Sequence, residues 1–452
     1  MKKYVHFSIF NILSQVIKII MDPLVSYIRK LRWLVVLLIL LLALITWSCK
    51  DILNPPDSKL TNEALLEYMK EWYLWYDTMP DVSANKFSTQ QELLDTLILK
   101  PTDKWSCIQK TSEYNDYYSK GIYTGHGIGL RWNSEGKLKV GFIFDDSDLK
   151  TSGVTRGWEV TAINGNAIVP GEVIDTSILG PDVEGIQNSF TFRDLSGGIQ
   201  TLISTKKIID INAVLYSEII EIAGKKVGYF VFQNFTSASK DELTLLFSDF
   251  LAEDVDELII DLRYNPGGMT DVSLYLGNLF FGRVADKGAF IKFVYNDKKS
   301  DRNVDLRFKP ETNSIIIPRV FFITTRSTAS ASEVLINSIK PYYDKIDMVI
   351  VGDTTHGKPV GMIAKQFTDY TLVPITYFMY NRDHEGEFFE GLPPDYFVAD
   401  DLDEAFGSPE EDCLKEVLYF IENGTFTGRH KSYSSSFPWK SGGGQGAALG
   451  AI

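Results

Sequence analysis

The segment IIIPRVFFITTRSTASASEVLINSI, residues 315–339, joins two structural patterns through a short run of small polar residues. Its first part is nearly all apolar, which is typical of a strand buried on both faces of a sheet. Its last part is typical of a helix. Between them lies STASASE, residues 327–333, where Ser330 and Glu333 have the spacing of a capping box. A serine at a helix start would also face free backbone N–H groups that stabilise a developing oxyanion. The segment therefore leaves two hypotheses for Ser330, a helix cap and a nucleophile.

A second apolar run, ELIIDL, continues into the loop RYNPGG and together they cover residues 257–268. Gly267 and Gly268 follow the predicted strand, and because they lack Cβ atoms their backbone N–H groups could approach a substrate carbonyl. The alternative is a simple turn that ends the strand. Since functional groups gather beyond the carboxyl ends of parallel strands, we expect these glycines near Ser330.

A third run, DMVIVGD, leads into TTHGKPVG, so that residues 347–361 form the same pattern of strand and loop. A serine hydroxyl is inert at neutral pH without a base, and this loop offers His356 and Lys358. A lysine acts as a base only when it is neutral, and burial in apolar surroundings lowers its pKa. The alternative is a solvated lysine with no catalytic part.

The chain divides by composition into several predicted regions. Residues 50–61 are a polar linker, and residues 62–110 have apolar and aromatic positions at helical spacing, which predicts a small helical domain with that stripe as its core. Residues 111–208 are rich in short strands and glycines. Residues 209–429 alternate strand and helix, which predicts an α/β core with a mostly parallel sheet. The Ser/Gly-rich residues 430–452 predict a flexible tail.

The glycine-rich region carries GIGL at residues 127–130 and SGVTRGWEVTAINGNAI at residues 152–168. The two segments together resemble a PDZ domain, with Trp158 where an acidic residue is usual. In a PDZ domain the glycine loop binds the terminal carboxylate of a peptide, and the peptide adds to the sheet as a strand. The resemblance makes the loop a candidate peptide-binding site formed by Gly127, Ile128, Gly129 and Leu130. Taken alone, the loop could be an ordinary β-turn.

Residues 1–49 are predicted to direct export and anchoring. An apolar run of 15 residues, 33–47, follows a basic cluster and has the length of a signal-peptide core rather than of a membrane span. Cys49 then follows a small residue, which resembles a bacterial lipobox and implies a lipidated cysteine. An uncleaved membrane anchor is the alternative. Both predictions place the body of the protein outside the cytoplasm, in the cell envelope and facing the periplasm or the cell surface.

Composition excludes several classes of protein. The formal net charge of −14 argues against nucleic acid as a partner, and 44% apolar residues are ample for folded cores. Beyond Cys49 only Cys107 and Cys413 remain, too few for a disulfide scaffold. Five scattered histidines and no HExxH motif predict no metal site and no cofactor. Protein or peptide partners are favoured.

The order LIIDLRYNPGG, STASASE, VGDTTHGKP after a PDZ-like region resembles the C-terminal processing peptidases, also called tail-specific proteases. The resemblance covers most of residues 110–410. It implies a core of the crotonase/ClpP type, a serine endopeptidase, Ser330 as nucleophile and Lys358 as general base. It also implies an oxyanion hole made by the N–H of Ala331 and of one glycine of the pair Gly267 and Gly268.

The sequence departs from this family at several positions. Met362 stands where members often have a glutamine that orients the lysine, and Asp344 is the only match for a carboxylate sometimes present after the nucleophile. His356 falls at an aromatic position and is interpreted as a pocket wall. We expect an exported endopeptidase that forms an acyl-enzyme and cleaves near unstructured C-terminal tails. The alternatives are a catalytically silent peptide-binding lipoprotein and a crotonase-like acyl-CoA enzyme, although the latter explains neither the PDZ-like region nor the export signal.

Overall fold

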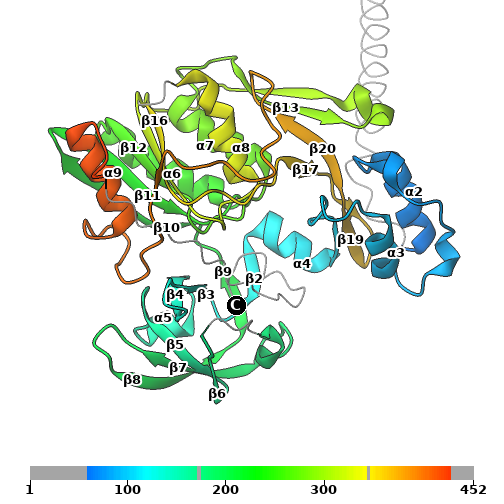
Figure 1. The fold of residues 1–452 in the computed structure, drawn as a ribbon, viewed down its shortest axis with the longest axis horizontal. Coiled ribbons are helices and arrows are strands. Elements are labelled where there is room, and N and C mark those ends of the chain that lie inside the picture. Colours follow the sequence, from blue (N-terminus) through cyan, green and yellow to red (C-terminus); the bar gives the residue numbers. More distant parts are fainter. Residues whose placement is uncertain (1–58, 171–174, 344–346, 429–452) are drawn as a thin grey trace, which may run out of the picture. The chain divides into compact units, whose positions relative to one another are not determined.

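Several of the apolar runs form one six-stranded sheet at the centre of the core (Figure 1). The computed structural model describes residues 59–170, 175–343 and 347–428. In sheet order the strands are β10 (Val214–Ile222), β11 (Lys225–Phe232), β12 (Glu257–Asp261), β15 (Val320–Thr324), β16 (Met348–Gly352) and β21 (Tyr396–Phe397). β10 and β11 are antiparallel, and all other neighbours in this sheet are parallel. The expected α/β core with a mostly parallel sheet is therefore confirmed.

Helices cover both faces of this sheet, which explains why its central strands carry apolar residues on both faces. Leu258 and Ile260 pack into one hydrophobic cluster with three helices, whereas Ile259, pointing the other way, packs with a fourth. The three helices on the first face are α6 (Ser239–Ala252), α7 (Thr270–Phe281) and α8 (Ala331–Ile339), and the fourth is α9 (Asp412–Asn423).

The start of α6 differs from what its local sequence pattern predicts. Ser239 and Glu242 have the spacing of a capping box, but Ser239 is the first helical residue and its hydroxyl donates to the carbonyl of Thr236. The Glu242 carboxylate instead accepts from the backbone N–H groups of Ala213, at 2.8 Å, and Val214, at 2.9 Å. Glu242 therefore fixes the entry into β10 and does not cap its own helix.

Two smaller antiparallel sheets extend the core towards the N-terminal helices. The larger has the order β14 (Val304–Arg307), β13 (Ala289–Tyr295), β20 (Ile375–Tyr380) and β17 (Val360–Met362). The smaller has the order β1 (Cys107–Lys110), β19 (Tyr370–Val373) and β18 (Lys365–Gln366). Short turns of 3-10 helix occur at η1 (Tyr76–Thr78), η2 (Ala84–Lys86), η5 (Asp297–Arg302) and η6 (Lys340–Tyr342).

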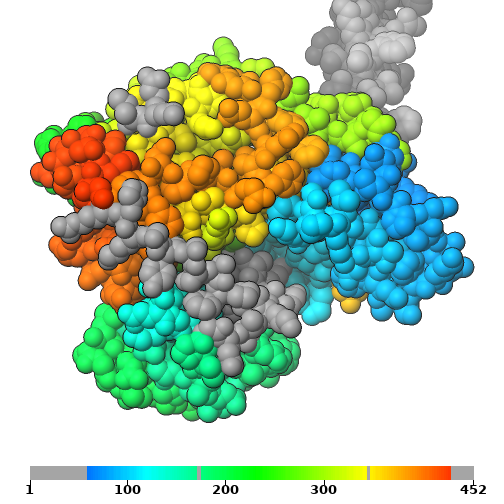
Figure 2. All heavy atoms as spheres, viewed as in Figure 1, coloured from blue at the N-terminus to red at the C-terminus, as the bar shows by residue number. Residues whose placement is uncertain are grey.

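The N-terminal helices α2 (Asn62–Trp72) and α3 (Gln90–Leu97) share a hydrophobic cluster with strands of these smaller sheets. Leu65 and Met69 are completely buried in it, as expected for the apolar stripe. The Asn296 side chain also donates to the carbonyl of Tyr73. In the space-filling view the blue atoms of the N-terminal helices lie against the yellow-green atoms of the segment that contains Asn296 (Figure 2).

The glycine-rich region forms a separate antiparallel sheet with its own apolar cluster, which includes Val140, Val160 and Phe190. Its strands, in sheet order, are β3 (Ile128–Trp132), β4 (Leu138–Ile143), β5 (Glu159–Ile163), β7 (Gln187–Arg193) and β8 (Ile199–Thr205), and β6 (Asn166–Ala167) pairs with β5. Short helices α5 (Asp148–Thr151) and η4 (Thr176–Leu179) complete it. The pair β2 (Ile122–Gly125) and β9 (Lys207–Asp210) lies at its chain ends, and α4 (Thr111–Asn115) with the π-helix η3 (Asp116–Lys120) precedes it.

Several expected features lie outside the described residues: the apolar run 33–47, Cys49, Asp344 and the tail 430–452. Within the described ranges, no helix has the length and apolarity needed to cross a membrane. Cys107 and Cys413 are both free thiols.

Candidate active site

Three loops that leave neighbouring strands of the central sheet bring the candidate residues together. β12, β15 and β16 are adjacent and parallel, so the segments after Asp261, Thr324 and Gly352 emerge at the same edge. These segments lead to Gly267 and Gly268, to Ser330 and to Lys358 respectively. The edge is the place where an open α/β sheet binds its ligands.

Ser330 stands at the N-cap of α8 in an unusual backbone conformation, with φ 54° and ψ −113°. A non-glycine residue rarely adopts a positive φ outside a strained turn. The Ser330 N–H donates to Glu333 Oε2 at 2.8 Å, and the Ser330 carbonyl accepts from the N–H of Val334. The Glu333 part of the predicted capping box is therefore present, and the half-exposed serine is held at the end of a buried helix.

The two glycines are required by close contacts with two neighbouring segments. A Cβ atom on Gly267 would lie 2.7 Å from Ser330 Cβ and 2.9 Å from the Ala331 nitrogen. A Cβ atom on Gly268 would lie 2.3 Å from the Phe235 carbonyl oxygen. Both glycines also have positive φ, 102° and 140°. A side chain at Gly267 would push the glycine loop away from the serine loop, and one at Gly268 would push it away from the segment around Phe235.

Asn265 connects the glycine loop to the serine loop. Its buried side chain accepts from the Gly267 N–H and donates to the carbonyl of Phe232, both at 2.9 Å. Its own carbonyl accepts from the Ala329 N–H and from the Ser332 hydroxyl. The Gly267 N–H is therefore already bonded.

Two other backbone N–H groups at this place are free of protein acceptors. In the part of the chain that the structure describes, neither the N–H of Gly268 nor that of Ala331 donates to a backbone or side-chain group. Ala331 is the first residue of α8, so its N–H also lies at the positive end of the helix dipole. A pair of free donors of this kind can bind a developing oxyanion.

Glu333 connects the serine loop to the lysine loop. One carboxylate oxygen accepts from the Ser330 N–H at 2.8 Å and from the Lys358 N–H at 2.9 Å. The other accepts from the Thr355 hydroxyl and the Gly357 N–H, both at 2.6 Å. Burial raises the pKa of Glu333, although these four bonds oppose the rise. Sequence reasoning identified Glu333 only as half of a helix cap, since its second set of partners lies 22 or more positions along the chain.

Lys358 is held beside Met362 and is partly buried. Its Nζ lies 3.3 Å from Met362 Sδ. Burial lowers the pKa of Lys358, and the charges of Cys107, Glu333 and Asp103 oppose this shift without cancelling it. The register of β17 on β20 shifts between Gly361 and Met362, an irregularity that can redirect a side chain. The site therefore favours a neutral lysine.

His356 contacts its surroundings through Trp105 and the serine loop. Its backbone N–H donates to the carbonyl of Thr328, and its Nε2 lies 3.4 Å from Trp105 Nε1. An indole N–H can only donate, so Nε2 accepts and the proton of the neutral ring is on Nδ1. Burial, followed by nearby positive charges, lowers the pKa of His356. Its side chain makes no hydrogen bond to Ser330 in the described structure.

Arg263, which sequence reasoning did not select, supports the glycine loop from below. The fully buried guanidinium contacts both oxygens of Asp261 and both oxygens of Glu411, and it reaches Asp400 at 3.0 Å. Burial alone would raise the pKa of Glu411, but the charge of Arg263 outweighs it and the pKa is lowered. Its partners lie up to 148 positions away, so no local pattern could reveal the network.

The candidate peptide loop, residues 127–130, lies in the separate glycine-rich sheet. Gly127 has φ 74° and its carbonyl accepts from the Phe144 N–H. Ile128 and Leu130 are completely buried in the cluster of that sheet. A Cβ atom on Gly129 would lie 2.2 Å from the ring of Phe142, so this glycine is needed for packing.

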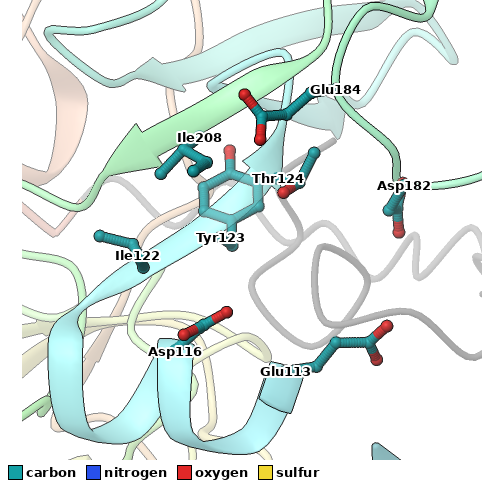
Figure 3. A pocket seen from close by; sticks show the side chains of 8 residues that line it. All are labelled: Glu113, Asp116, Ile122, Tyr123, Thr124, Asp182, Glu184 and Ile208. Atoms are coloured by element: carbon teal, nitrogen blue, oxygen red, sulfur yellow. The ribbon is translucent and has the colours of Figure 1, made fainter.

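A surface pocket beside β2 and β9 is lined by acidic side chains and belongs to neither candidate site (Figure 3). Glu113, Asp116, Asp182 and Glu184 surround Tyr123. Three of these carboxylates have lysine partners: Lys110 with Glu113, Lys120 with Asp116 and Lys206 with Asp182. Over the described ranges, no group of three or more His, Cys, Asp or Glu side chains could hold a metal ion.

Comparison with known proteins adds independent information. Peptidase family S41 matches residues 226–398, and the S41 N-terminal domain matches residues 61–107. The chain is 24% identical over 336 residues to the chloroplastic carboxyl-terminal-processing peptidase 1 of Arabidopsis thaliana, which covers 71% of this chain and 66% of the relative. It is 24% identical over 371 residues to a "Probable CtpA-like serine protease" of Staphylococcus epidermidis, which covers 80% of this chain and 72% of the relative.

A solved structure has the same fold. The crystal structure of a Bacteroides fragilis protein assigned to the S41 proteases superposes with a TM-score of 0.64 at 22% identity, over 81% of this chain and 99% of that one. The fold, the family matches and these relatives define a serine-type peptidase. Residues 226–398 and 61–107 thus match domains of peptidase family S41, and these matches support the resemblance of the chain to the C-terminal processing peptidases.

Proposed function

We propose that this chain is an exported endopeptidase that cleaves proteins near unstructured C-terminal tails, with Ser330 as nucleophile and Lys358 as general base. The observation that carries the proposal is the bridge through Glu333, which binds the N–H groups of both residues. It fixes the two loops that carry the reacting side chains to one another. Partial burial, which lowers the pKa of Lys358, supports its role, because a base must be neutral to accept a proton.

The reaction would proceed through an acyl-enzyme. Ser330 Oγ attacks the scissile carbonyl carbon while its proton moves to Lys358 Nζ. The N–H groups of Gly268 and Ala331 would receive the oxyanion, because the Gly267 N–H is bonded to Asn265. The C–N bond then breaks and Lys358 returns the proton to the leaving amine. Water, activated by the neutral lysine, hydrolyses the ester and restores Ser330.

The glycine-rich sheet is proposed as a PDZ-like domain that captures a substrate segment at residues 127–130. Support comes from β3, which is an edge strand and could accept a peptide as an added strand. Within the same proposal, residues 1–49 direct export and Cys49 carries a lipid anchor, with the protein facing the periplasm or the cell surface. The domain limits 50–61, 62–110, 111–208, 209–429 and 430–452 are proposed with it.

Proteolysis of an unfolded protein tests the mechanism. Wild type, Ser330→Ala and Lys358→Ala are incubated with casein, and the fragments are identified by mass spectrometry. We expect cleavage by wild type and a loss of at least about 10³-fold in both variants. Cleavage by Ser330→Ala at the wild-type rate would contradict the assignment of the nucleophile.

A fluorophosphonate probe separates the peptidase from the catalytically silent binding protein. The contact of Lys358 Nζ with a thioether, in place of a stronger acceptor, is the observation that favours the silent alternative. An activated serine reacts with the probe and an inert one does not. We expect labelling of the wild type that is lost in Ser330→Ala. Absence of labelling in the wild type would favour the binding function.

A further inference from the structure

Two exposed cationic side chains, Lys104 and Arg326, stand on loops that flank Lys358. Arg326 lies four positions before Ser330 in the loop after β15. Its Nη1 lies 3.3 Å from the carbonyl oxygen of Thr355 and 3.3 Å from that of Glu390. These contacts place the guanidinium on the loop that carries Lys358.

Lys104 reaches the same loop from the N-terminal region. The next residue, Trp105, contacts His356 through its indole nitrogen at 3.4 Å, and the two rings meet edge to face at 6.3 Å. Lys358 Nζ is 6.0 Å from the centre of the same indole ring. The backbone of residue 104 is therefore fixed next to the candidate active site, although it precedes Ser330 by more than two hundred positions.

The two exposed cations have no ion-pair partner among the described residues. In the described ranges, neither Lys104, Arg326 nor Lys358 forms an ion pair, and Glu390 offers Arg326 only its backbone carbonyl. The charges of Lys104 and Arg326 both act on His356 and contribute, after burial, to its lowered pKa. Two exposed positive charges without ion pairs therefore stand beside the candidate site, in a chain with a formal net charge of −14.

We propose that Lys104 and Arg326 form a subsite for a carboxylate of the substrate, next to the bond that is cut. A guanidinium and an ammonium without partners are the groups that bind a carboxylate most strongly, and the guanidinium can do so with two hydrogen bonds. The ligand is a free C-terminal carboxylate or an acidic side chain of the same peptide. This inference rests on the proposed function, since it places the peptide across Ser330.

Peptide binding tests the subsite without requiring turnover. The full chain carrying Ser330→Ala is titrated into three fluorescein-labelled peptides of one sequence: a free acid, a C-terminal amide, and an amide with one glutamine replaced by glutamate. We expect the free acid or the glutamate peptide to bind more tightly than the neutral amide. The double variant Lys104→Ala/Arg326→Ala should lower the affinity for that peptide by about three- to tenfold, which is the range that two exposed ion pairs allow. The affinity for the neutral amide should not change.

The arms of the experiment identify the source of the carboxylate. Sensitivity of the free acid alone would assign the subsite to the chain end, and sensitivity of the glutamate peptide alone would assign it to an acidic side chain. Lys86→Ala is the matched control, because it removes one exposed positive charge from η2. It should change no affinity by more than about twofold.

The inference is overturned if the preference for a carboxylate is the same in the double variant as in its parent. That result would assign carboxylate binding to another surface, such as residues 127–130. It is also overturned if no peptide distinguishes acid from amide. Failure of the proposed function would appear separately, as casein cleavage that does not depend on Ser330.

Discussion

At the scale of single residues, Ser330 can be both a helix cap and a nucleophile, the two roles that the sequence leaves as alternatives. It occupies the N-cap of α8, and its φ of 54° costs on the order of 1–3 kcal/mol for a non-glycine residue. Glu333, Val334 and the neighbouring Ala329 hold it there through backbone bonds. The bond to Glu333 uses the backbone N–H of Ser330 and not its hydroxyl, so a helix cap and a nucleophile are compatible at one position.

Met362 supplies the acceptor atom next to Lys358 Nζ, and this contact leads to a prediction about the pH dependence of activity. A thioether is a weak acceptor, whereas an amide oxygen would stabilise the ammonium form and raise the pKa of Lys358. The neutral base exists above this pKa, so kcat/KM rises with pH through it. We expect Met362→Gln to move the rising limb to higher pH, measured as kcat/KM for a peptide from pH 5 to 10.

Met362→Leu is the matched control, because it preserves apolar volume and removes the sulfur. Its rising limb should stay at or below the wild-type position, since no new acceptor is added. A Met362→Gln profile that coincides with the wild type would show that this side chain does not tune the lysine.

The sequence predicts those candidate residues that stand in loops directly after apolar strands. Gly267, Gly268, Ser330 and Lys358 follow apolar strands, and the structure brings their loops to one edge of the sheet. Asn265 was not predictable, because its importance comes from bonds to segments that are distant in sequence. The sequence also could not decide which of the two glycines has a free N–H. The structure shows that the Gly267 N–H is bonded to Asn265, whereas that of Gly268 is not.

At the scale of elements, α9 supports the site although it lies on the opposite face of the sheet. Glu411 caps this helix by accepting from the Leu414 N–H, and it also pairs with the buried guanidinium of Arg263. Arg263 stands two positions before Asn265, within the loop that carries the glycines. The last helix and the glycine loop therefore depend on one buried pair of charges.

Removing Glu411 should destabilise the whole core. Glu411→Ala leaves the Arg263 guanidinium buried with less charge around it, and we expect the free energy of unfolding to fall by about 3–5 kcal/mol. Glu411→Gln keeps an acceptor for the helix cap and should lose less. The measurement is chemical denaturation followed by circular dichroism.

Glu410→Ala is the control for this prediction, because Glu410 is exposed and pairs only with the exposed Lys415. Its effect should stay within about 0.5 kcal/mol. Equal losses for Glu410→Ala and Glu411→Ala would mean that the buried pair contributes little to stability.

Elements were easier to predict than their ends. The alternation of Leu258, Ile259 and Ile260 between two hydrophobic clusters follows from strand geometry once both faces are known to be covered. The spacing of Ser239 and Glu242 predicts a capping box for α6 that does not form. Glu242 instead accepts from two backbone N–H groups at the start of β10, which a local pattern does not contain. Tertiary bonds decide such ends, and sequence spacing alone cannot rank them.

At the scale of the whole molecule, one side chain connects the glycine-rich sheet to the segment beneath the candidate site. Arg156 donates to the carbonyls of Glu404 and Asp401, and it contacts the Asp400 carboxylate at 3.1 Å. It also donates to the hydroxyl of Tyr264, the residue before Asn265. The guanidinium is buried, and Phe406 lies against it with the ring centre 4.4 Å away. Arg156 is thus a buried link between the glycine-rich sheet and the glycine loop. It is not the only one, because Arg131 lies over the Tyr264 ring at 4.8 Å and Lys139 pairs with Asp403.

Loss of this cation should loosen both sides of the connection. Arg156→Ala removes the donors of at least four hydrogen bonds. Among the described residues it leaves the Asp400 carboxylate with Arg263 and Tyr264 as partners, so we expect the free energy of unfolding to fall by about 3 kcal/mol or more. Hydrogen exchange should rise in residues 399–406 and in the loop after β12, with the centre of the six-stranded sheet unchanged.

Arg193→Ala, which breaks an exposed pair with Glu159 in the glycine-rich sheet, is the control and should leave both segments protected. If Arg156→Ala raised exchange only within residues 121–210, the cation would stabilise its own sheet alone and movement of that sheet could not reach Asn265 by this route.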